Sequence, residues 1–340
     1  MKVFFPLIVC IFLYSCSKTS EETSKLENKE IIELTTNKID PPDSILVMPM
    51  QLSLVEDSLA ILKIGSDTYN FVLFDINNNK LFPFGLIGEG PNEVSDWVVF
   101  NDFNKSNRIL QFFDMQRRSV LKISVDEIFN NAVNHFTVSP RIQGHLFSMI
   151  ELDNGHQIST GRFSKRLRIR QNTEESYIID YPFRDELVEH SHNVLAMAYQ
   201  GKLKIHPDQS NKILYFTFNS PNLDIFEVPY TPASHIKKHY WKPDFEGVEN
   251  GSNSRARLNN TNKGGFRFGT VTSNFMYLNS PISSDKYTEV IIYDWEGNQH
   301  ETLRFDTKVN AIAVSSDDSK IYAIEESGTS DLLWAEIPKN

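Results

Sequence analysis

The sequence predicts an all-β fold, a six-bladed β-propeller of four-stranded antiparallel blades, and three observations support this prediction. Short runs rich in Val, Ile, Phe, Tyr and Leu recur in pairs along the chain, and turn residues separate the two runs of each pair. Aromatic residues make up 12% of the 340 residues, with 24 Phe and 12 Tyr, and large flat side chains favour strands. Helical periodicity is almost absent. A small unit that repeats indicates an architecture of stacked modules.

Six candidate hairpins follow one another, and each consists of a strongly apolar strand, a polar turn and a second strand. One hairpin cannot bury both of its faces, so the units must stack, and a ring of blades leaves few sheet edges open. Six hairpins therefore predict six blades, with a β-sandwich or two smaller β domains as the alternatives. The hairpins occupy residues 58–84, 108–125, 166–181, 212–228, 288–297 and 320–337.

Two segments outside the hairpins have predictions of their own. Residues 30–35, EIIELT, resemble a strand that precedes the first blade. We expect them to form the outer strand of the last blade, because an open ring would leave exposed edges. Residues 126–133 predict a short helix with Asp126 as its N-cap, inserted between blades.

The N-terminus has the pattern of a signal peptide over residues 1–15. Lys2 supplies a positive charge, and residues 3–14 form an uncharged apolar run of twelve residues. A helix of that length is too short to span a hydrocarbon core about 30 Å thick. The run therefore matches the apolar region of a secretory signal.

The sequence Leu13-Tyr14-Ser15-Cys16 at the end of this run resembles the lipobox of bacterial lipoproteins. The resemblance implies that a diacylglycerol is attached to the Cys16 sulfur, that the chain is cleaved before Cys16, and that the new amino group receives a fatty acid such as palmitate. Several acyl chains would hold the protein to a membrane of the cell envelope, as an outer-membrane lipoprotein on the periplasmic face or the cell surface. The alternative is an ordinary signal peptide that happens to precede a Cys.

The mature chain would begin at Cys16 with a polar, charged segment. Residues 16–30 cannot bury enough surface to fold alone, so we expect a flexible tether, and residues 31–340 form the propeller domain. Of the two Cys, Cys10 leaves with the signal peptide and Cys16 would be capped by lipid. This excludes a disulfide, a thiol nucleophile and a Cys-ligated zinc site in the mature chain.

Residues 84–93, FGLIGEGPNE, contain a Gly-x-Gly-Pro-x-Glu core at residues 88–93. This core resembles a signature that follows the first blade in TolB-like six-bladed propeller lipoproteins of Bacteroidetes. The resemblance implies a propeller on a cell-envelope lipoprotein and supplies no catalytic residues. In physical terms, Gly88 and Gly90 permit positive φ and Pro91 fixes the next turn, so the loop could gather backbone N–H groups into an anion-binding nest. The alternative is a plain connection between blades.

The longest polar stretch of the folded part, residues 241–268, lacks strand signals. Loops this long in a compact domain are usually functional or disordered. This one mixes aromatic rings with guanidinium groups, as sites for sugars and peptides often do. The candidate ligand-binding residues are Trp241, Phe245, Arg255, Arg257 and Phe266.

Two further patterns have both a functional and a structural interpretation. His190 and His192 would face the same side of a strand, as metal ligands do, but no third ligand can be named and no metal site is predicted. Arg166, Arg168 and Arg170 alternate with apolar residues and form one basic face of a strand. That face could bind carboxylates or phosphates, although we expect a solvated outer face of a blade.

Composition and motifs exclude several classes of function. The 34 Lys and Arg against 44 Asp and Glu give a formal charge of −10, which argues against nucleic-acid binding. No Gly-x-Ser-x-Gly elbow is present, no cofactor is predicted and no catalytic residue can be assigned.

We therefore expect a monomeric binding or scaffolding module for an envelope protein, a peptide or a glycan. One alternative is a hydrolase or lyase that acts on a polysaccharide or lactone in the propeller channel, and another is a purely structural partner in an outer-membrane complex. Perturbed carboxylates or histidines at a channel mouth would favour the enzyme.

Overall fold

The computed structural model describes residues 24–27, 29–41, 48–90, 92–130, 135–282, 284–326 and 331–338. The predicted signal peptide, Cys16 and Pro91 lie outside the described residues. Among the described residues, no helix is both long and apolar enough to cross a membrane.

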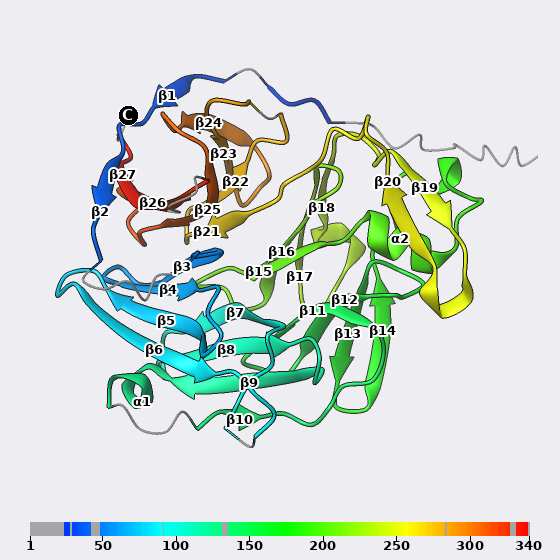
Figure 1. The fold of residues 1–340 in the computed structure, drawn as a ribbon. Coiled ribbons are helices and arrows are strands. Elements are labelled where there is room, and N and C mark those ends of the chain that lie inside the picture. The colour runs from blue at the N-terminus through cyan, green and yellow to red at the C-terminus, as the bar shows by residue number, and fades with distance from the viewer. Residues whose placement is uncertain are drawn as a thin grey trace, which may run out of the picture.

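Six four-stranded sheets surround a common axis, so the predicted six-bladed propeller is confirmed (Figure 1). The inner strand of each blade lies next to the axis, and the other strands follow outward in antiparallel order. Blade 1 comprises β3 (Gln51–Glu56), β4 (Leu59–Lys63), β5 (Tyr69–Asp75) and β6 (Lys80–Leu86), and blade 2 comprises β7 (Val98–Asn104), β8 (Ile109–Asp114), β9 (Ser119–Ser124) and β10 (Thr137–Val138). Blade 3 comprises β11 (Leu146–Glu151), β12 (Gln157–Gly161), β13 (Leu167–Gln171) and β14 (Glu174–Ile178), and blade 4 comprises β15 (Gly201–Ile205), β16 (Lys212–Thr217), β17 (Asn222–Glu227) and β18 (Ile236–His239). Blade 5 comprises β21 (Gly269–Val271), β22 (Phe275–Asn279), β23 (Glu289–Asp294) and β24 (Gln299–Arg304), and blade 6 comprises β25 (Val309–Val314), β26 (Lys320–Glu325), β27 (Leu332–Glu336) and β2 (Asn37–Ile39).

Apolar side chains fill the gap between every two neighbouring blades. Between blades 1 and 2, for example, the rings of Phe71 and Phe112 lie 4.7 Å apart, and both side chains are fully buried. Between blades 6 and 1, Leu62 packs in one cluster with Ile324. The middle strands are buried on both faces, which is why their sequences are continuous apolar runs that could be recognised in advance.

The N-terminal strands close the ring. β2 pairs antiparallel with β27, with Lys38 opposite Leu333, and so supplies the outer strand of blade 6. β1 (Ile31–Glu33) instead pairs in parallel with β24 and adds a fifth strand to blade 5. The prediction that residues 30–35 form the outer strand of the last blade was therefore wrong. Residues 37–39 form that strand, and residues 31–33 belong to blade 5. The chain crosses from blade 5 to blade 6 between these strands, where Leu34 is buried in the cluster between the two blades.

The described part of the predicted tether contacts the propeller. The backbone N–H of Ser24 donates to the carbonyl of His239 at 2.8 Å. The backbone N–H of Glu27 donates to the side-chain oxygen of Gln299 at 3.1 Å, and the amide of Gln299 donates back to the Glu27 carbonyl. The predicted tether is therefore in contact with blades 4 and 5 at Ser24 and Glu27.

The predicted short helix exists, but it lies within blade 2 and not between blades. α1 (Val125–Phe129) connects β9 to β10. Its N-cap is Ser124 and not Asp126, because the Ser124 hydroxyl accepts from the Asp126 N–H while the Glu127 carboxylate accepts from the Ser124 N–H. This reciprocal pair is a capping box, and it places the N-cap two residues before Asp126.

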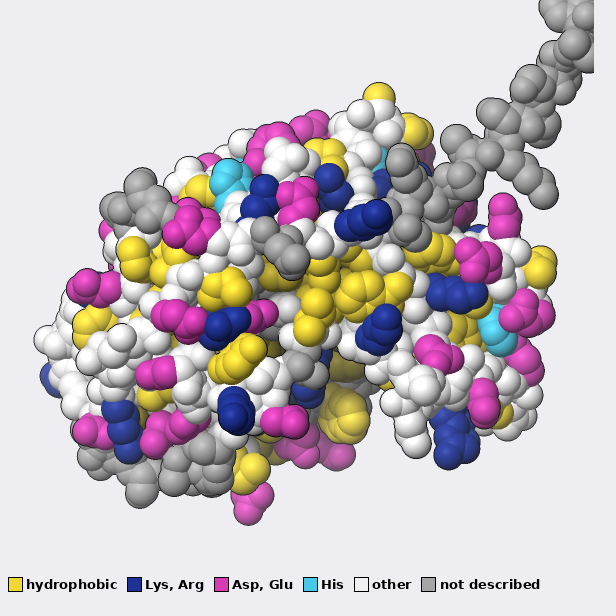
Figure 2. All heavy atoms as spheres, turned by 90° about the horizontal axis from the view of Figure 1, so that it is seen from above, with side chains coloured by type: hydrophobic (Ala, Val, Ile, Leu, Met, Phe, Trp, Pro, Cys, Tyr) yellow, Lys and Arg dark blue, Asp and Glu magenta, His cyan; other side chains and the backbone are white. Residues whose placement is uncertain are grey.

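The polar stretch 241–268, predicted to lack strands, forms a hairpin. β19 (Phe245–Val248) and β20 (Arg255–Leu258) pair antiparallel and pack on α2 (His192–Ala198), at the outer edge of the ring (Figure 1). Single-turn 3₁₀ helices lie nearby at Arg184–Glu186, Pro232–Ser234 and Gly251–Asn253. Figure 2 shows the molecule edge-on, where acidic and basic side chains are interspersed around a band of hydrophobic side chains.

We expect a chain that begins at residue 41 to be less stable than one that begins at residue 24, by at least about 3 kcal/mol. The shorter chain lacks β1, β2 and the buried Leu34, so blades 5 and 6 each lose a strand. Urea unfolding followed by tryptophan fluorescence measures the difference. Equal unfolding midpoints for the two chains would contradict this account of ring closure.

Candidate functional site

The inner strands leave a channel along the axis of the ring. We call the mouth at which these strands begin the proximal mouth, and the mouth at which they end the distal mouth. Strands β3, β7, β15 and β25 contribute side chains to both mouths, and β21 contributes them to the distal mouth. Because side chains alternate along a strand, β15 directs Lys202 and Lys204 into the channel while Leu203 packs between blades 3 and 4.

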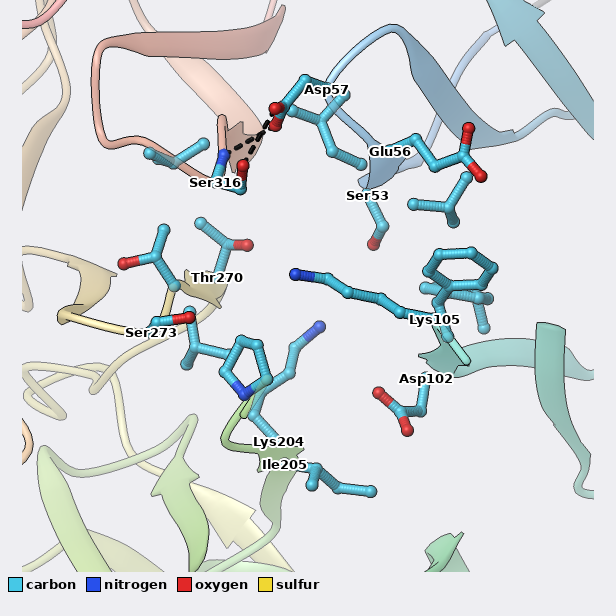
Figure 3. Close-up of a pocket in the computed structure, with 18 of the residues that line it drawn as sticks. Ser53, Glu56, Asp57, Asp102, Lys105, Lys204, Ile205, Thr270, Ser273 and Ser316 are labelled. Carbon is cyan, nitrogen blue, oxygen red and sulfur yellow. Dashed lines mark hydrogen bonds between the residues drawn. The ribbon is translucent and has the colours of Figure 1, made fainter. Parts of the chain in front are cut away.

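The distal mouth is a pocket of about 360 Å³. The side chains of Lys105 and Lys204 extend toward its middle, as Figure 3 shows. The hydroxyl groups of Ser53, Thr270 and Ser273 lie along its wall. Ammonium and hydroxyl groups that converge on one space can bind an anionic oxygen by charge-assisted hydrogen bonds.

Two of the three carboxylates at the distal mouth are engaged with protein groups. Asp57 accepts hydrogen bonds from the backbone N–H and the hydroxyl of Ser316, at 2.7 and 2.9 Å (Figure 3). Glu56 forms an ion pair with Arg108 at 3.1 Å. Burial raises the pKa of the third, Asp102, against the opposing effects of the Phe103 N–H and of Lys204.

The proximal mouth is a pocket of about 290 Å³ with a different charge. Lys202, Lys204 and Arg267 line it, and no Asp or Glu does so among the residues that the structure describes. Lys204 and Asn101 line both pockets, so the two mouths meet at these side chains. Only cations line the proximal mouth among the described charged residues, whereas acidic and basic side chains are interspersed on the outer edge of the ring (Figure 2).

The two channel lysines lack partners. Neither ammonium group makes a hydrogen bond or an ion pair with the part of the chain that the structure describes. Burial, with a smaller contribution from the neighbouring Lys204, lowers the pKa of Lys202 to about 7. Burial also lowers the pKa of Lys204, although Asp102 opposes this shift. Half-buried cations without partners destabilise a fold, so their presence is a mark of a binding site.

The five candidate ligand-binding residues do not come together. Phe266 is fully buried between blades 4 and 5, and Trp241 packs against the same cluster. Phe245 lies against the ring of His190, with centroids 4.8 Å apart. Arg255 and Arg257 are exposed on β20, at the outer edge of the ring. The structure divides these residues between the core and the outer hairpin.

In the Gly-rich loop between blades 1 and 2, the side chain of Glu93 occupies the position where an anion was expected. The Glu93 carboxylate accepts from the Gly90 N–H at 2.7 Å, and a side chain at position 88 would collide with that carboxylate. Arg117 fixes the loop by donating to the carbonyls of Glu93 and Gly88. Neither Gly88 nor Gly90 has positive φ, whereas Gly85 does. The loop is therefore a connection between blades, with its nest filled by Glu93.

The two predicted histidines are not on a strand. His190 precedes α2 and lies 3.1 Å from the Glu189 carboxylate, and His192 is the first residue of α2. Within the described ranges, no group of three His, Cys, Asp or Glu side chains could hold a metal ion.

The basic face of residues 166–170 is mostly buried, so the prediction of a solvated outer face was wrong. The side chain of Arg166 is 0% exposed and forms an ion pair with Asp224 at 2.5 Å, from blade 3 to blade 4. Burial would raise the pKa of the Asp224 carboxyl, but Arg166, His239 and His235 hold it well below its usual range. Arg168 is bonded to Ser159 within blade 3. These arginines join strands and blades, unlike the channel lysines.

Solved structures with the same fold include two from Bacteroides. A protein of Bacteroides fragilis that is assigned as exported is 13% identical, with a TM-score of 0.55 over 94% of this chain and 98% of its own. A member of the DUF4221 family from Bacteroides vulgatus is 12% identical, with a TM-score of 0.54 over 91% of this chain and 99% of its own. The β-propeller domain of Cps50 (Swd1) from Myceliophteria thermophila is 10% identical, with a TM-score of 0.50 over 89% of this chain and 100% of its own. No protein-family model and no curated protein matches the chain, and the likeness to the solved structures shows the fold alone.

We expect Lys202→Met to be at least as stable as the wild type at pH 7, because it removes a buried ammonium group that has no partner. The pKa of Lys202 is about 7 in the folded chain, below the value of about 10.4 for an unfolded one. Between these pH values the unfolded chain binds more protons, so the wild type gains stability as pH rises while the variant does not.

Urea unfolding at pH 6, 7 and 9 measures this difference, with the exposed Lys80→Met as the matched control. The advantage of Lys202→Met over the wild type should shrink toward pH 9. A Lys202→Met variant that is less stable than the wild type at pH 7 would show that this lysine supports the fold.

Proposed function

We propose that this protein is an exported lipoprotein of the bacterial envelope whose propeller binds a partner through an anionic group held in the central channel. The observation that supports this function is the pair Lys202 and Lys204, two cations that face the channel and have no hydrogen-bond or ion-pair partner among the described residues. The formal charge of the whole chain is −10, yet the channel contains these two lysines, and a ligand can enter there. The surrounding protein has a lower dielectric constant than water, which strengthens the attraction between an ammonium group and an anion.

The envelope location is supported by the sequence and by a structural neighbour. The signal-peptide pattern and the lipobox-like Leu13-Tyr14-Ser15-Cys16 precede the propeller. A protein of the same fold from Bacteroides fragilis is assigned as exported. The similarity of residues 88–93 to the signature of TolB-like propeller lipoproteins points the same way.

A hydrolase or lyase that works in the same channel is the second candidate function, and Asp102 is the observation that favours it. Burial raises the pKa of its carboxyl, as in general acids, and Lys204 lies near it. Glycoside hydrolysis requires a second carboxylate, but Glu56 and Asp57 are bonded to Arg108 and Ser316. Release of reducing ends from an envelope polysaccharide by the wild type, and not by Asp102→Asn, would favour the enzyme.

We expect glutarate to bind the protein with millimolar affinity and the double variant Lys202→Met/Lys204→Met to lose at least tenfold in affinity. Each carboxylate replaces water around a desolvated ammonium group, so binding relieves the cost of the unpaired charges. Isothermal titration calorimetry measures the affinity. Lys80→Met/Lys122→Met removes two lysines outside the channel mouths and serves as the control. Equal affinities for the wild type and the channel variant would refute the proposal.

We expect Cys16→Ala to abolish incorporation of labelled fatty acid and to move any processed protein from the membrane to the soluble fraction. The reason is that the Cys16 sulfur is the expected acceptor of the diacylglycerol, and the attached acyl chains supply the membrane affinity. Metabolic labelling and fractionation of cells measure both effects. Unchanged labelling of the variant would contradict the lipid anchor at Cys16 but would not bear on the proposed binding of anions in the channel.

A further inference from the structure

The proximal mouth differs from the distal mouth in the charge of its lining, whereas apolar side chains line both mouths. Its charged lining is wholly cationic in the described residues, and apolar side chains surround the opening. The distal mouth contains three carboxylates and a wall rich in hydroxyl groups. The two mouths of one channel are therefore built for different chemistry.

Partly exposed apolar side chains line the proximal mouth. Met50, Met115, Phe147, Phe218 and Phe268 line the mouth, and we call these residues the rim. Met50 is 48% exposed. Met48 and Trp97, on the segments that lead into β3 and β7 at the same end of the ring, are 63% and 65% exposed.

A hydrogen-bonded lysine holds these segments together. The Met50 N–H donates to the Lys63 carbonyl at 2.8 Å, and the Lys63 ammonium donates to the carbonyls of Asp96 and Val98, on either side of Trp97. These hydrogen bonds fix the backbone at Met50 and on both sides of Trp97. Exposed apolar side chains on a fixed backbone mark an interface, and Met and Trp are among the residues that interfaces prefer.

We infer that the proximal mouth binds an extended acidic peptide segment of a partner protein, with a carboxylate side chain inserted between Lys202 and Arg267 and its apolar neighbours on the rim. The inference rests on the proposed function, because it names the ligand of the same channel. A small inorganic anion would leave the rim exposed, and an apolar ligand would leave the lysines unpaired. An acidic polysaccharide would neutralise the cations but would offer little apolar surface to the thioethers. The side-chain amides of Gln51, Gln200 and Asn310 also line this mouth and can bond a peptide backbone.

Binding of the carboxylate is coupled to proton uptake. The charged groups around Lys202 are Lys204 on the same strand, Arg267 before β21 and, beyond Lys204, Asp102 on β7. The facing strands β3, β11 and β25 contribute Gln51, Ser148 and Asn310, which do not titrate. Because the pKa of Lys202 is about 7 in the free channel, a carboxylate beside it raises that pKa and draws in a proton near neutral pH. The affinity therefore falls as pH rises from 6 to 9.

Fluorescence anisotropy of the full-length protein in detergent tests the inference with three pools of labelled decapeptides. The first pool alternates Glu with Leu, Phe and Met, the second replaces Glu by Gln, and the third replaces the apolar residues by Ser. We expect the first pool to bind at least tenfold more tightly than either of the others. Lys202→Gln and Arg267→Gln should each weaken its binding about tenfold, whereas Lys105→Met at the distal mouth should leave it within twofold.

Met50→Ser separates the rim from the cations, because it should weaken binding of the first pool and leave glutarate binding unchanged. Equal binding of the Glu and Gln pools, or an equal loss in Lys105→Met, would overturn the inference. Tighter binding of polygalacturonate fragments than of the first pool would also overturn it. If glutarate binds through the channel lysines and no peptide pool binds, this inference fails while the proposed function stands. If glutarate does not bind either, both fail.

Discussion

Every blade in this propeller needs a neighbour on each side, and that requirement governs the rest of the structure. The middle strands are buried on both faces, and ring closure by β2 gives the first and last blades the partners they would otherwise lack. Apolar contact between blades leaves two places for polar side chains, the outer edge and the channel. A buried ion between blades needs an opposite charge, and Asp224 supplies it for Arg166.

The same requirement explains which elements the sequence could reveal. β5 and β16 are continuous runs of Phe, Leu, Ile and Tyr because both faces are covered, and such runs between turns predict strands directly. The inner strands are harder to recognise. β21 has three residues, Gly269–Val271, and β15 reads GKLKI, in which half of the side chains face the water of the channel. Six blades were therefore predictable from their middle strands, whereas the channel lining was not.

The candidate site was missed for this reason, although a signal existed. Lys202 and Lys204 alternate with Leu203 just before the strong strand of residues 212–217, and an inner strand is due at that point of the repeat. Alternation alone does not decide the outcome, because RLRIR at residues 166–170 has the same pattern and places Arg166 between blades. The position of a strand within its blade distinguishes a channel cation from a structural one, and it becomes known only when the blades are aligned. The aromatic and cationic residues of the stretch 241–268 drew attention by composition and proved to belong to the core and an outer hairpin.

The contrast between Arg166 and Lys202 shows how one fold uses buried charge in two ways. Arg166 donates to a carboxylate that two histidines also contact, so its charge is balanced inside the protein and can only support the structure. Lys202 faces a space bordered by Lys204 and Arg267, so its charge can be balanced only from outside. Lys204 lines both mouths and lies near Asp102, so an anion at either mouth alters the electrostatic potential at the other. An acidic group bound at the proximal mouth would stabilise the protonated form of Lys204. The two ends of the channel are thus coupled through one side chain, without any movement of the blades.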